Sequence, residues 1–158
     1  SNLVSAGAYL EGLDGGESCP LAPEDPFENG FKGLKWGAKS YGTVNIQFIS
    51  RDHDLNISYY LGQRDLEVSE LGGIPMKKGA FLYGFINSTF SMLRGTALYK
   101  DREAFEGLKA FFESFLGPVD TYSPNVNSLW ERDRYKAFLY REKDGSVAFW
   151  LVNKEYHR

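Results

Sequence analysis

The stretch from 81 to 118 constrains the fold of this chain most strongly, because strand, turn, strand and helix signals follow one another there without a gap. Aromatic residues alternate along 81–85, an Asn-Ser pair follows at 87–88, and a run of apolar and β-branched residues resumes over 89–99. Two such runs joined by two turn residues are typical of a β-hairpin. The sequence therefore predicts an antiparallel hairpin in this region.

A helix signal follows the hairpin directly. Asp101 stands at an N-cap position, and acidic residues at 103 and 106 lie in the first turns, where the positive end of a helix dipole favours them. The apolar residues recur at helical spacing until Gly117-Pro118 ends the pattern, and they are Phe105, Leu108, Phe112 and Phe115. We expect one long amphipathic helix, about 101–116, packed on one face of a sheet.

Further strands are expected on both sides of this unit. Alternating residues over 43–49 and an Ile-, Tyr- and Leu-rich run over 56–61 predict two strands joined by a turn. Residues 62–79 are expected to form a loop with short extended pieces, because Gly and Pro interrupt their apolar residues. After the helix, strands are expected at 128–131, 134–141 and 146–152, with Asp144-Gly145 as the last hairpin turn. This order of elements predicts an α+β domain with a mainly antiparallel sheet.

The charge distribution separates an N-terminal arm from the rest of the chain. Residues 1–30 contain six acidic residues and no Lys or Arg, a charge of −6, whereas residues 31–158 carry eighteen basic and fifteen acidic residues, a charge of +3. We expect an acidic N-terminal arm at 1–30 and a single α+β domain at 31–158. The arm either folds against its own domain or a neighbouring copy, or is a solvated leader, and the sequence leaves both interpretations open.

Composition argues against several classes of protein. The small positive charge of the domain, with no stripe of Lys and Arg between aromatic residues, argues against a nucleic-acid partner. Cys19 is the only cysteine, so an internal disulfide is excluded and a thiolate metal site is not expected. No apolar run approaches the roughly 20 residues of a membrane-spanning helix. We therefore expect a soluble domain with no membrane span and no cofactor.

Short aromatic and glycine motifs run through the chain in a set order. Residues 31–37 form an aromatic-x-Gly-aliphatic-x-aromatic-Gly segment, Phe31-Lys32-Gly33-Leu34-Lys35-Trp36-Gly37. Later landmarks are Tyr59-Tyr60, Gly72-Gly73-Ile74, Tyr83-Gly84-Phe85, Phe115-Leu116-Gly117-Pro118 and Leu129-Trp130. Over about 31–152, this order resembles a family of small, uncharacterised bacterial envelope or exported proteins. Members usually carry a signal sequence, so the resemblance implies a periplasmic or cell-envelope location, and a first residue other than Met agrees with a removed leader. The resemblance brings no catalytic residue.

Few residues offer catalytic or metal-binding chemistry. Asp52-His53-Asp54 combines an imidazole with two carboxylates, but adjacent side chains point in different directions, so we interpret this trio as a polar turn. Carboxylates two residues apart could flank a sugar as in glycosidases, although any acidic sheet surface looks the same; the pairs are Asp52/Asp54, Asp65/Glu67 and Glu131/Asp133. No Gly-x-Ser-x-Gly motif exposes a nucleophile. We predict no catalytic and no metal-ligating residue.

Three functions remain open. We favour a non-catalytic binding or protein-interaction domain of the bacterial cell envelope, whose partner is an unknown protein or small molecule, because aromatic residues are abundant and a credible catalytic set is missing. The candidate binding residues are Phe31, Trp36, Tyr59, Tyr60 and Trp130, with Trp150 as a further ring. The alternative is a small carboxylate-based hydrolase that acts on carbohydrate or another small molecule. A third hypothesis is a structural subunit that forms a homodimer through the N-terminal arm.

Overall fold

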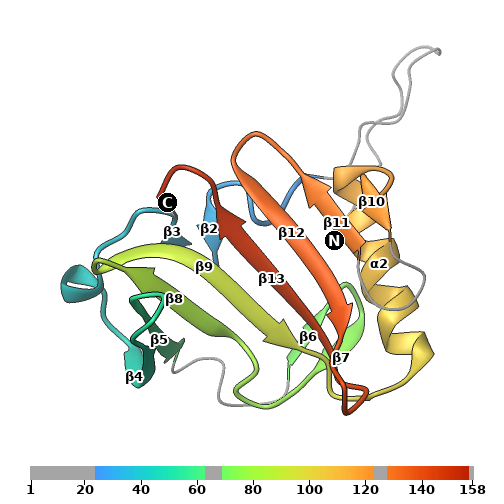
Figure 1. The fold of residues 1–158 in the computed structure, drawn as a ribbon, viewed down its shortest axis with the longest axis horizontal. Coiled ribbons are helices and arrows are strands. Elements are labelled where there is room, and N and C mark those ends of the chain that lie inside the picture. Colours follow the sequence, from blue (N-terminus) through green and yellow to red (C-terminus); the bar gives the residue numbers. More distant parts are fainter. Residues whose placement is uncertain (1–23, 63–68, 123–127, 157–158) are drawn as a thin grey trace, which may run out of the picture.

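The computed structural model describes residues 24–62, 69–122 and 128–156, and one eight-stranded antiparallel sheet dominates them (Figure 1). From one edge to the other its strands are β10 (Thr121–Tyr122), β11 (Ser128–Glu131), β12 (Tyr135–Arg141), β13 (Val147–Asn153), β9 (Thr89–Thr96), β8 (Leu82–Ile86), β5 (Ile57–Gly62) and β4 (Ile46–Asp52). The one α-helix of the described residues is α2 (Arg102–Leu116). Two small hairpins complete these segments, β2 (Gly30–Phe31) with β3 (Leu34–Lys35) and β6 (Ser69–Leu71) with β7 (Ile74–Met76). The predicted α+β class with a mainly antiparallel sheet is confirmed.

The sheet is assembled from two parts of the chain. The hairpins β4–β5 and β8–β9 form one part, and the meander from β10 to β13, which follows α2, forms the other. The two parts join where β13 pairs with β9, with Leu151 opposite Leu93. In Figure 1, β13 accordingly lies between β9 and β12 in the middle of the sheet. The final strand of the described chain is therefore an interior strand.

The hairpin and the helix that the sequence predicted are present with the expected local chemistry. Asn87 and Ser88 have φ angles of 51° and 63°, as a two-residue type I′ turn requires. The Asp101 carboxylate accepts a hydrogen bond of 2.8 Å from the backbone N–H of Ala104, which caps the start of α2. The helix ends at Gly117, whose φ of 83° lies in the left-handed region that glycine adopts most easily.

The strand expected at 43–49 begins later and ends later than predicted. A 3₁₀ turn, η1 (Ser40–Gly42), precedes it, and Asn45 has a φ of 63°, which an extended strand does not accommodate. β4 therefore starts at Ile46 and continues to Asp52, so Asp52, which was expected in the polar turn, is the last residue of the strand. The Asp52 carboxylate then accepts a hydrogen bond of 3.0 Å from the backbone N–H of Leu55 within the turn.

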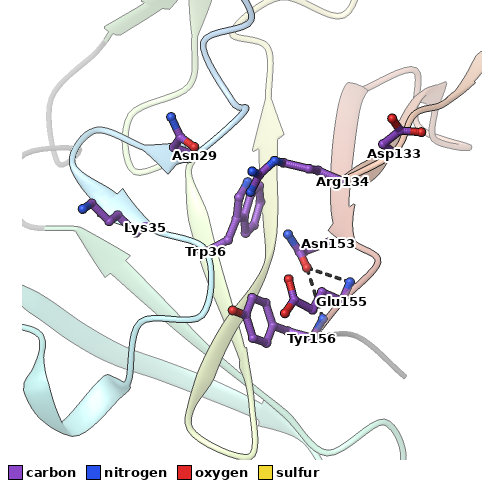
Figure 2. A pocket seen from close by; sticks show the side chains of 8 residues that line it. All are labelled: Asn29, Lys35, Trp36, Asp133, Arg134, Asn153, Glu155 and Tyr156. Carbon is purple, nitrogen blue, oxygen red and sulfur yellow. Dashed lines mark hydrogen bonds between the residues drawn. The ribbon is translucent and has the colours of Figure 1, made fainter.

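Residues 24–37 lead from the interior of the domain to one end of the sheet. The Phe27 side chain is fully buried, and the Asp25 carboxylate accepts a hydrogen bond of 2.6 Å from the Tyr135 hydroxyl on β12. The Trp36 indole N–H donates to the Phe27 carbonyl at 2.8 Å, and the ring lies near the C-terminal turn (Figure 2). The described part of the expected arm, 24–30, thus packs into the domain, while residues 1–23 lie outside the described residues.

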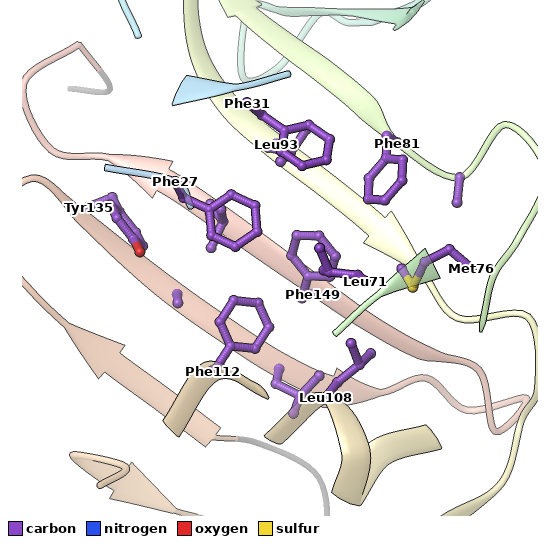
Figure 3. Packing of buried hydrophobic residues seen from close by; sticks show 14 of the residues in the cluster. Phe27, Phe31, Leu71, Met76, Phe81, Leu93, Leu108, Phe112, Tyr135 and Phe149 are labelled. Atoms are coloured by element: carbon purple, nitrogen blue, oxygen red, sulfur yellow. The ribbon is translucent and has the colours of Figure 1, made fainter. Parts of the chain in front are cut away.

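A cluster of aromatic rings fills the space between the sheet and α2 (Figure 3). Phe112 of α2 is fully buried, and its ring lies 5.5 Å from Phe149 of β13 and 5.4 Å from Trp130 of β11. The side chains that α2 buries are Ala104, Phe105, Leu108, Phe112 and Leu116. Gly95 makes room for this cluster from β9, because a Cβ there would lie 2.3 Å from the Phe149 ring. The apolar stripe predicted for the helix is therefore its packing face.

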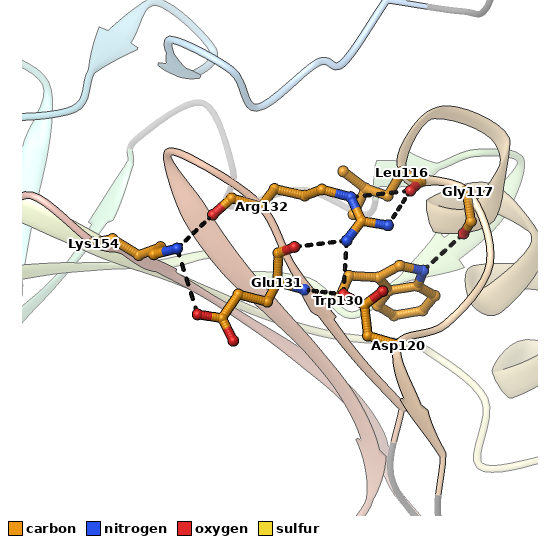
Figure 4. Close-up of polar contacts among 7 residues, drawn as sticks. All are labelled: Leu116, Gly117, Asp120, Trp130, Glu131, Arg132 and Lys154. Atoms are coloured by element: carbon orange, nitrogen blue, oxygen red, sulfur yellow. Dashed lines mark hydrogen bonds and ion pairs between the residues drawn. The ribbon is translucent and has the colours of Figure 1, made fainter.

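Polar contacts attach the end of α2 to the edge of the sheet (Figure 4). The Arg132 guanidinium donates from Nε to the Leu116 carbonyl at 3.1 Å and from Nη1 to the Asp120 carboxylate at 2.7 Å. The Trp130 indole N–H donates to the Gly117 carbonyl at 3.0 Å. Because the last carbonyls of a helix lack partners within the helix, these donors satisfy groups that would otherwise be unpaired.

Candidate functional site

A pocket of about 640 Å³ opens at the end of the sheet where β12 begins and β13 ends (Figure 2). Three segments far apart in the sequence form it: residues 29–36, the turn at 133–134, and the stretch 153–156. The backbone N–H of Lys154 donates to the Arg134 carbonyl at 2.8 Å and joins two of these segments. We call this cavity the Trp36 pocket, because Trp36 forms its inner wall.

The inner wall of the Trp36 pocket is fixed in place by packing. Trp36 is only 8% exposed, and its ring stacks on Phe90 at 4.7 Å with an angle of 15° between the planes. Its single polar group is already satisfied, since the indole N–H donates to the Phe27 carbonyl. Trp36 therefore offers a ligand one edge or face of a rigid ring rather than a hydrogen bond.

Asn153 shapes the opposite side of the pocket. This residue ends β13 and is only 3% exposed, and its side-chain oxygen accepts hydrogen bonds from the backbone N–H groups of Glu155 at 2.9 Å and Tyr156 at 3.1 Å. The turn that results places the Tyr156 ring against Gly37, where a Cβ would lie 2.6 Å from the ring. Gly37 also has a φ of 87°, so both its conformation and its missing side chain are needed here.

The rim of the pocket carries charges of both signs. Lys35 and Arg134 contribute two cations, Asp133 and Glu155 contribute two carboxylates, and all four residues are exposed. Asn29 adds an amide. A guanidinium binds a carboxylate through two parallel hydrogen bonds, whereas carboxylates bind ammonium groups and hydroxyls. The arrangement suits a small polar ligand that is recognised by hydrogen bonds and charge.

A half-buried acid, Asp25, is bound to β12 and does not line the pocket. Burial raises the pKa of the Asp25 carboxyl, although the hydrogen bond from the Tyr135 hydroxyl opposes this effect. Burial also raises the pKa of that hydroxyl, and the neighbouring carboxylate adds to the shift. The pair fastens residues 24–27 to β12. An acid held this way is not positioned to protonate a molecule in the Trp36 pocket, so the pair is structural.

The residues predicted to bind a ligand do not form one site. Of the five, only Trp36 lines the pocket. Phe31 lies in the core with its ring 4.9 Å from Phe81 (Figure 3), and Trp130 is fully buried under α2 (Figure 4). Tyr60 also faces the core side of the sheet, with its ring 5.0 Å from Phe85, and lines a smaller pocket of about 250 Å³.

Tyr59 lies on the other face of the sheet, as alternation along a strand requires. Its ring is 6.4 Å from that of Trp150, over which the Arg94 guanidinium lies at 5.6 Å. Arg94 also forms an ion pair of 2.8 Å with Glu142, and the Trp150 indole N–H donates to the Tyr140 hydroxyl. These side chains contact one another across the strands, so this face presents a cross-strand cluster rather than a pocket.

Most residues of the Trp36 pocket carry no signal in the sequence. Asp133 stands out only as one member of a carboxylate pair, and nothing marks Asn153 or Tyr156.

In the described residues, no group of three or more His, Cys, Asp and Glu side chains is arranged to hold a metal ion. Asp52, His53 and Asp54 lie at the end of β4 and in the turn after it, as expected for a polar turn. His157 and Cys19 lie outside the described residues.

No protein-family model, no curated protein and no solved structure matches this chain. The resemblance to envelope proteins therefore stays a prediction from the sequence motifs. Within residues 24–62, 69–122 and 128–156, no helix combines the length and apolar character needed to cross a lipid bilayer.

Proposed function

We propose that this protein is a non-catalytic binding domain of the bacterial cell envelope and that the Trp36 pocket is its ligand site. The observation that carries the proposal is the construction of the pocket. Two buried side chains, Trp36 and Asn153, fix its walls, and charged groups of both signs line its rim. A preformed cavity with a few placed polar groups is the usual form of a small-molecule site.

The ligand class that fits this pocket is a small dipolar molecule, such as a free amino acid. Arg134 and Lys35 provide partners for its carboxylate, and Asp133 and Glu155 provide partners for its ammonium group. The volume of about 640 Å³ lies within the range of about 300–1,000 Å³ that is typical of ligand pockets. The rigid ring of Trp36 supplies an apolar surface for the remainder of the molecule.

Calorimetric titration with free glutamate, glutamine and lysine tests this proposal. We expect at least one of them to bind, and its N-acetylated form, which lacks the ammonium group, to bind about tenfold more weakly or not at all. The Arg134→Gln variant should show a loss of similar size. Arg102→Gln, an exposed arginine at the start of α2, is the matched control and should bind as the wild type does. If Arg134→Gln and Arg102→Gln bind the amino acid with equal affinity, the Trp36 pocket is not the ligand site.

The hydrolase alternative is favoured by one observation, the presence of Asp133 and Glu155 in the same pocket. Its test is hydrolysis of aryl glycosides by the wild type and by Asp133→Asn and Glu155→Gln. Cleavage that disappears in both variants would replace the binding proposal with the hydrolase. We expect no cleavage.

The envelope location is proposed from the motif order that begins at Phe31. Fractionation of cells that express the natural gene tests it, and recovery with the cytoplasm would contradict it.

We also propose, as a separate hypothesis, a homodimer formed through the acidic arm. Its test is light scattering before and after deletion of residues 1–23. Asp25 and Phe27 must be kept, because both contact the core.

A further inference from the structure

The smaller pocket of about 250 Å³ that Tyr60 lines is a second candidate site, and it shares no lining residue with the Trp36 pocket. Three parts of the chain form it: Ser40 of η1, residues 51–60 of the β4–β5 hairpin, and residues 85–88 at the turn between β8 and β9. In Figure 1, η1 and the β4–β5 hairpin lie at the left end of the molecule, opposite α2. We call this cavity the Arg51 pocket.

The lining of the Arg51 pocket is polar and contains a single charged side chain. Phe85 is the one described lining residue without a polar group in its side chain. The others carry a hydroxyl, an amide or a guanidinium, and they are Ser40, Arg51, Asn56, Ser58, Tyr60, Asn87 and Ser88. None of the described lining residues is Asp or Glu. The charge that the pocket offers a ligand is therefore positive.

The acid next to Arg51 in the chain belongs to the other face of the sheet. Arg51 lies opposite Ser58 in the pairing of β4 with β5, so these two side chains share a face, whereas Asp52 points to the opposite one. Burial raises the pKa of the Tyr59 hydroxyl on that opposite face, and the Asp52 carboxylate adds to the shift. Arg51 forms no ion pair with a carboxylate of the described residues. Its charge is thus not neutralised by a neighbour there.

A chain of hydrogen bonds fixes which atoms the pocket presents. The Arg51 guanidinium donates to the side-chain oxygen of Asn56, and the side-chain nitrogen of Asn56 donates to the side-chain oxygen of Asn87 at 3.0 Å. A guanidinium has donors and no acceptor, so this order of donors and acceptors follows from Arg51. Both amide oxygens already accept a hydrogen bond within the protein. The remaining N–H groups of Arg51 and Asn87 are the donors that a ligand can use.

The turn beside these amides adds donors rather than acceptors. The Ser88 carbonyl accepts a hydrogen bond of 2.8 Å from the Ser40 backbone N–H, and the Asn87 carbonyl accepts one of 3.3 Å from the Thr89 hydroxyl. The hydroxyls of Ser40, Ser58 and Ser88 form no hydrogen bond with another described residue. A hydroxyl can turn to donate to a ligand. The pocket therefore combines one cation with donors from three segments, which is the arrangement that an anion requires.

We propose that the Arg51 pocket binds a tetrahedral oxyanion, phosphate or sulfate, either as the free ion or as the end group of a larger molecule. The Arg51 guanidinium pairs with two of its oxygens, and the Asn87 amide and the serine hydroxyls donate to the others. A volume of about 250 Å³ is below the range of about 300–1,000 Å³ for drug-sized ligands, so it fits a single group of this kind. Donors on three sides suit four oxygens better than the two of a carboxylate.

An NMR titration with inorganic phosphate tests the proposal. The ionic strength is held at about 0.15 M by replacing chloride, so that screening stays constant. We expect saturable shifts of the backbone amide signals of Asn56, Asn87 and Ser88, and the same pattern with sulfate. Acetate and chloride should give no saturable shift. Absence of saturation with phosphate and sulfate would overturn the proposal, as would acetate binding of equal affinity.

Phenyl phosphate distinguishes the two sources of the oxyanion. Arg51, Asn87 and Ser88 are exposed, so the pocket opens to solvent and leaves room for a group attached to the phosphate. We expect phenyl phosphate to shift the same signals, which supports recognition of an end group. Binding of the inorganic ions without phenyl phosphate would support a site for the free ion.

An Asn-to-Asp substitution locates the site on the protein. Asn87→Asp keeps a residue type that tolerates the positive φ of the turn, but it replaces a donor by a carboxylate and should weaken phosphate binding at least about tenfold. The matched control is Asn45→Asp, which makes the same change at an exposed residue with a φ of 63° outside the pocket. Thermal melting checks that both variants fold. If both bind phosphate alike, the Arg51 pocket is not the site.

Arginine variants separate this proposal from that for the Trp36 pocket. Arg51→Gln should weaken phosphate binding at least about tenfold and leave amino-acid binding unchanged, whereas Arg134→Gln should leave phosphate binding unchanged. The reverse pattern for phosphate would place the oxyanion in the Trp36 pocket and overturn the proposal. Saturable, Arg51-dependent binding of a neutral sugar such as glucose, without binding of phosphate or sulfate, would also overturn it.

Discussion

Replacing Phe27 by Ala tests whether the segment that begins at residue 24 belongs to the domain core. The Phe27 ring is fully buried and lies within 5.5 to 6.4 Å of five other rings, from Phe31, Phe111, Phe112, Phe115 and Phe149. The substitution removes all of these contacts and leaves a cavity between α2 and β13. Truncation of a buried Phe to Ala costs about 3–5 kcal/mol.

That cost is a large share of the free energy of unfolding, which is about 5–15 kcal/mol for a typical domain. For a chain of this size each kcal/mol lowers the melting temperature by about 2–4 °C, so we expect a fall of about 6–20 °C. Calorimetric melting and urea titration measure the effect, and the urea midpoint should fall without a change of slope.

One control accompanies this measurement. Tyr41→Ala alters an aromatic residue that is 81% exposed and should change the free energy of unfolding by less than about 0.5 kcal/mol. A loss below about 1 kcal/mol in Phe27→Ala, well under the range for buried rings, would refute the placement of Phe27 in the core.

Three further predictions concern caps, glycine and pH. Asp101→Ala removes the acceptor of a 2.8 Å capping hydrogen bond and should cost about 1 kcal/mol in urea unfolding. Gly37→Ala should lower the free energy of unfolding by at least about 1–2 kcal/mol, because φ is 87° and the new Cβ would lie 2.6 Å from the Tyr156 ring. The control is Gly42→Ala, whose new Cβ would have no atom within 4 Å. Hydrogen bonds from the backbone N–H and the side chain of Ser146 lower the pKa of Asp144 from 3.8 to about 2. A lowered pKa in the folded state adds stability above pH 3.8 that is lost as the pH falls toward about 2, so melting temperatures of Asp144→Asn should fall less steeply over this interval.

The elements that the sequence predicted well are those specified by neighbouring residues. Asn87 and Ser88 tolerate the positive φ angles of a tight hairpin turn, and Asp101 and Gly117 supply the start and end of α2. Each of these signals acts within a few residues along the chain. The class of the fold is therefore predictable from the sequence alone.

The Trp36 pocket could not be predicted, because its walls come from segments about a hundred residues apart in the chain. The sequence also does not show which aromatic rings are accessible. Tyr59 and Tyr60 look alike in the sequence, yet adjacent strand residues point to opposite faces, and only Tyr60 packs toward the core. Phe27 gives no periodic signal in its Pro- and Glu-rich surroundings, although its ring lies at the centre of the aromatic cluster.

The interior position of β13 has a consequence for how this protein is made. During synthesis, the β4–β5 and β8–β9 hairpins leave the ribosome before residues 147–153 are made. Until then, the edge of β9 that pairs with β13 has no partner strand. Pairing across such a long stretch of chain makes folding slow, since the loop between the partners must close first. Nascent chains are thus most prone to aggregate just before the final strand emerges, and a stop codon within that strand would leave two ribbons that cannot join.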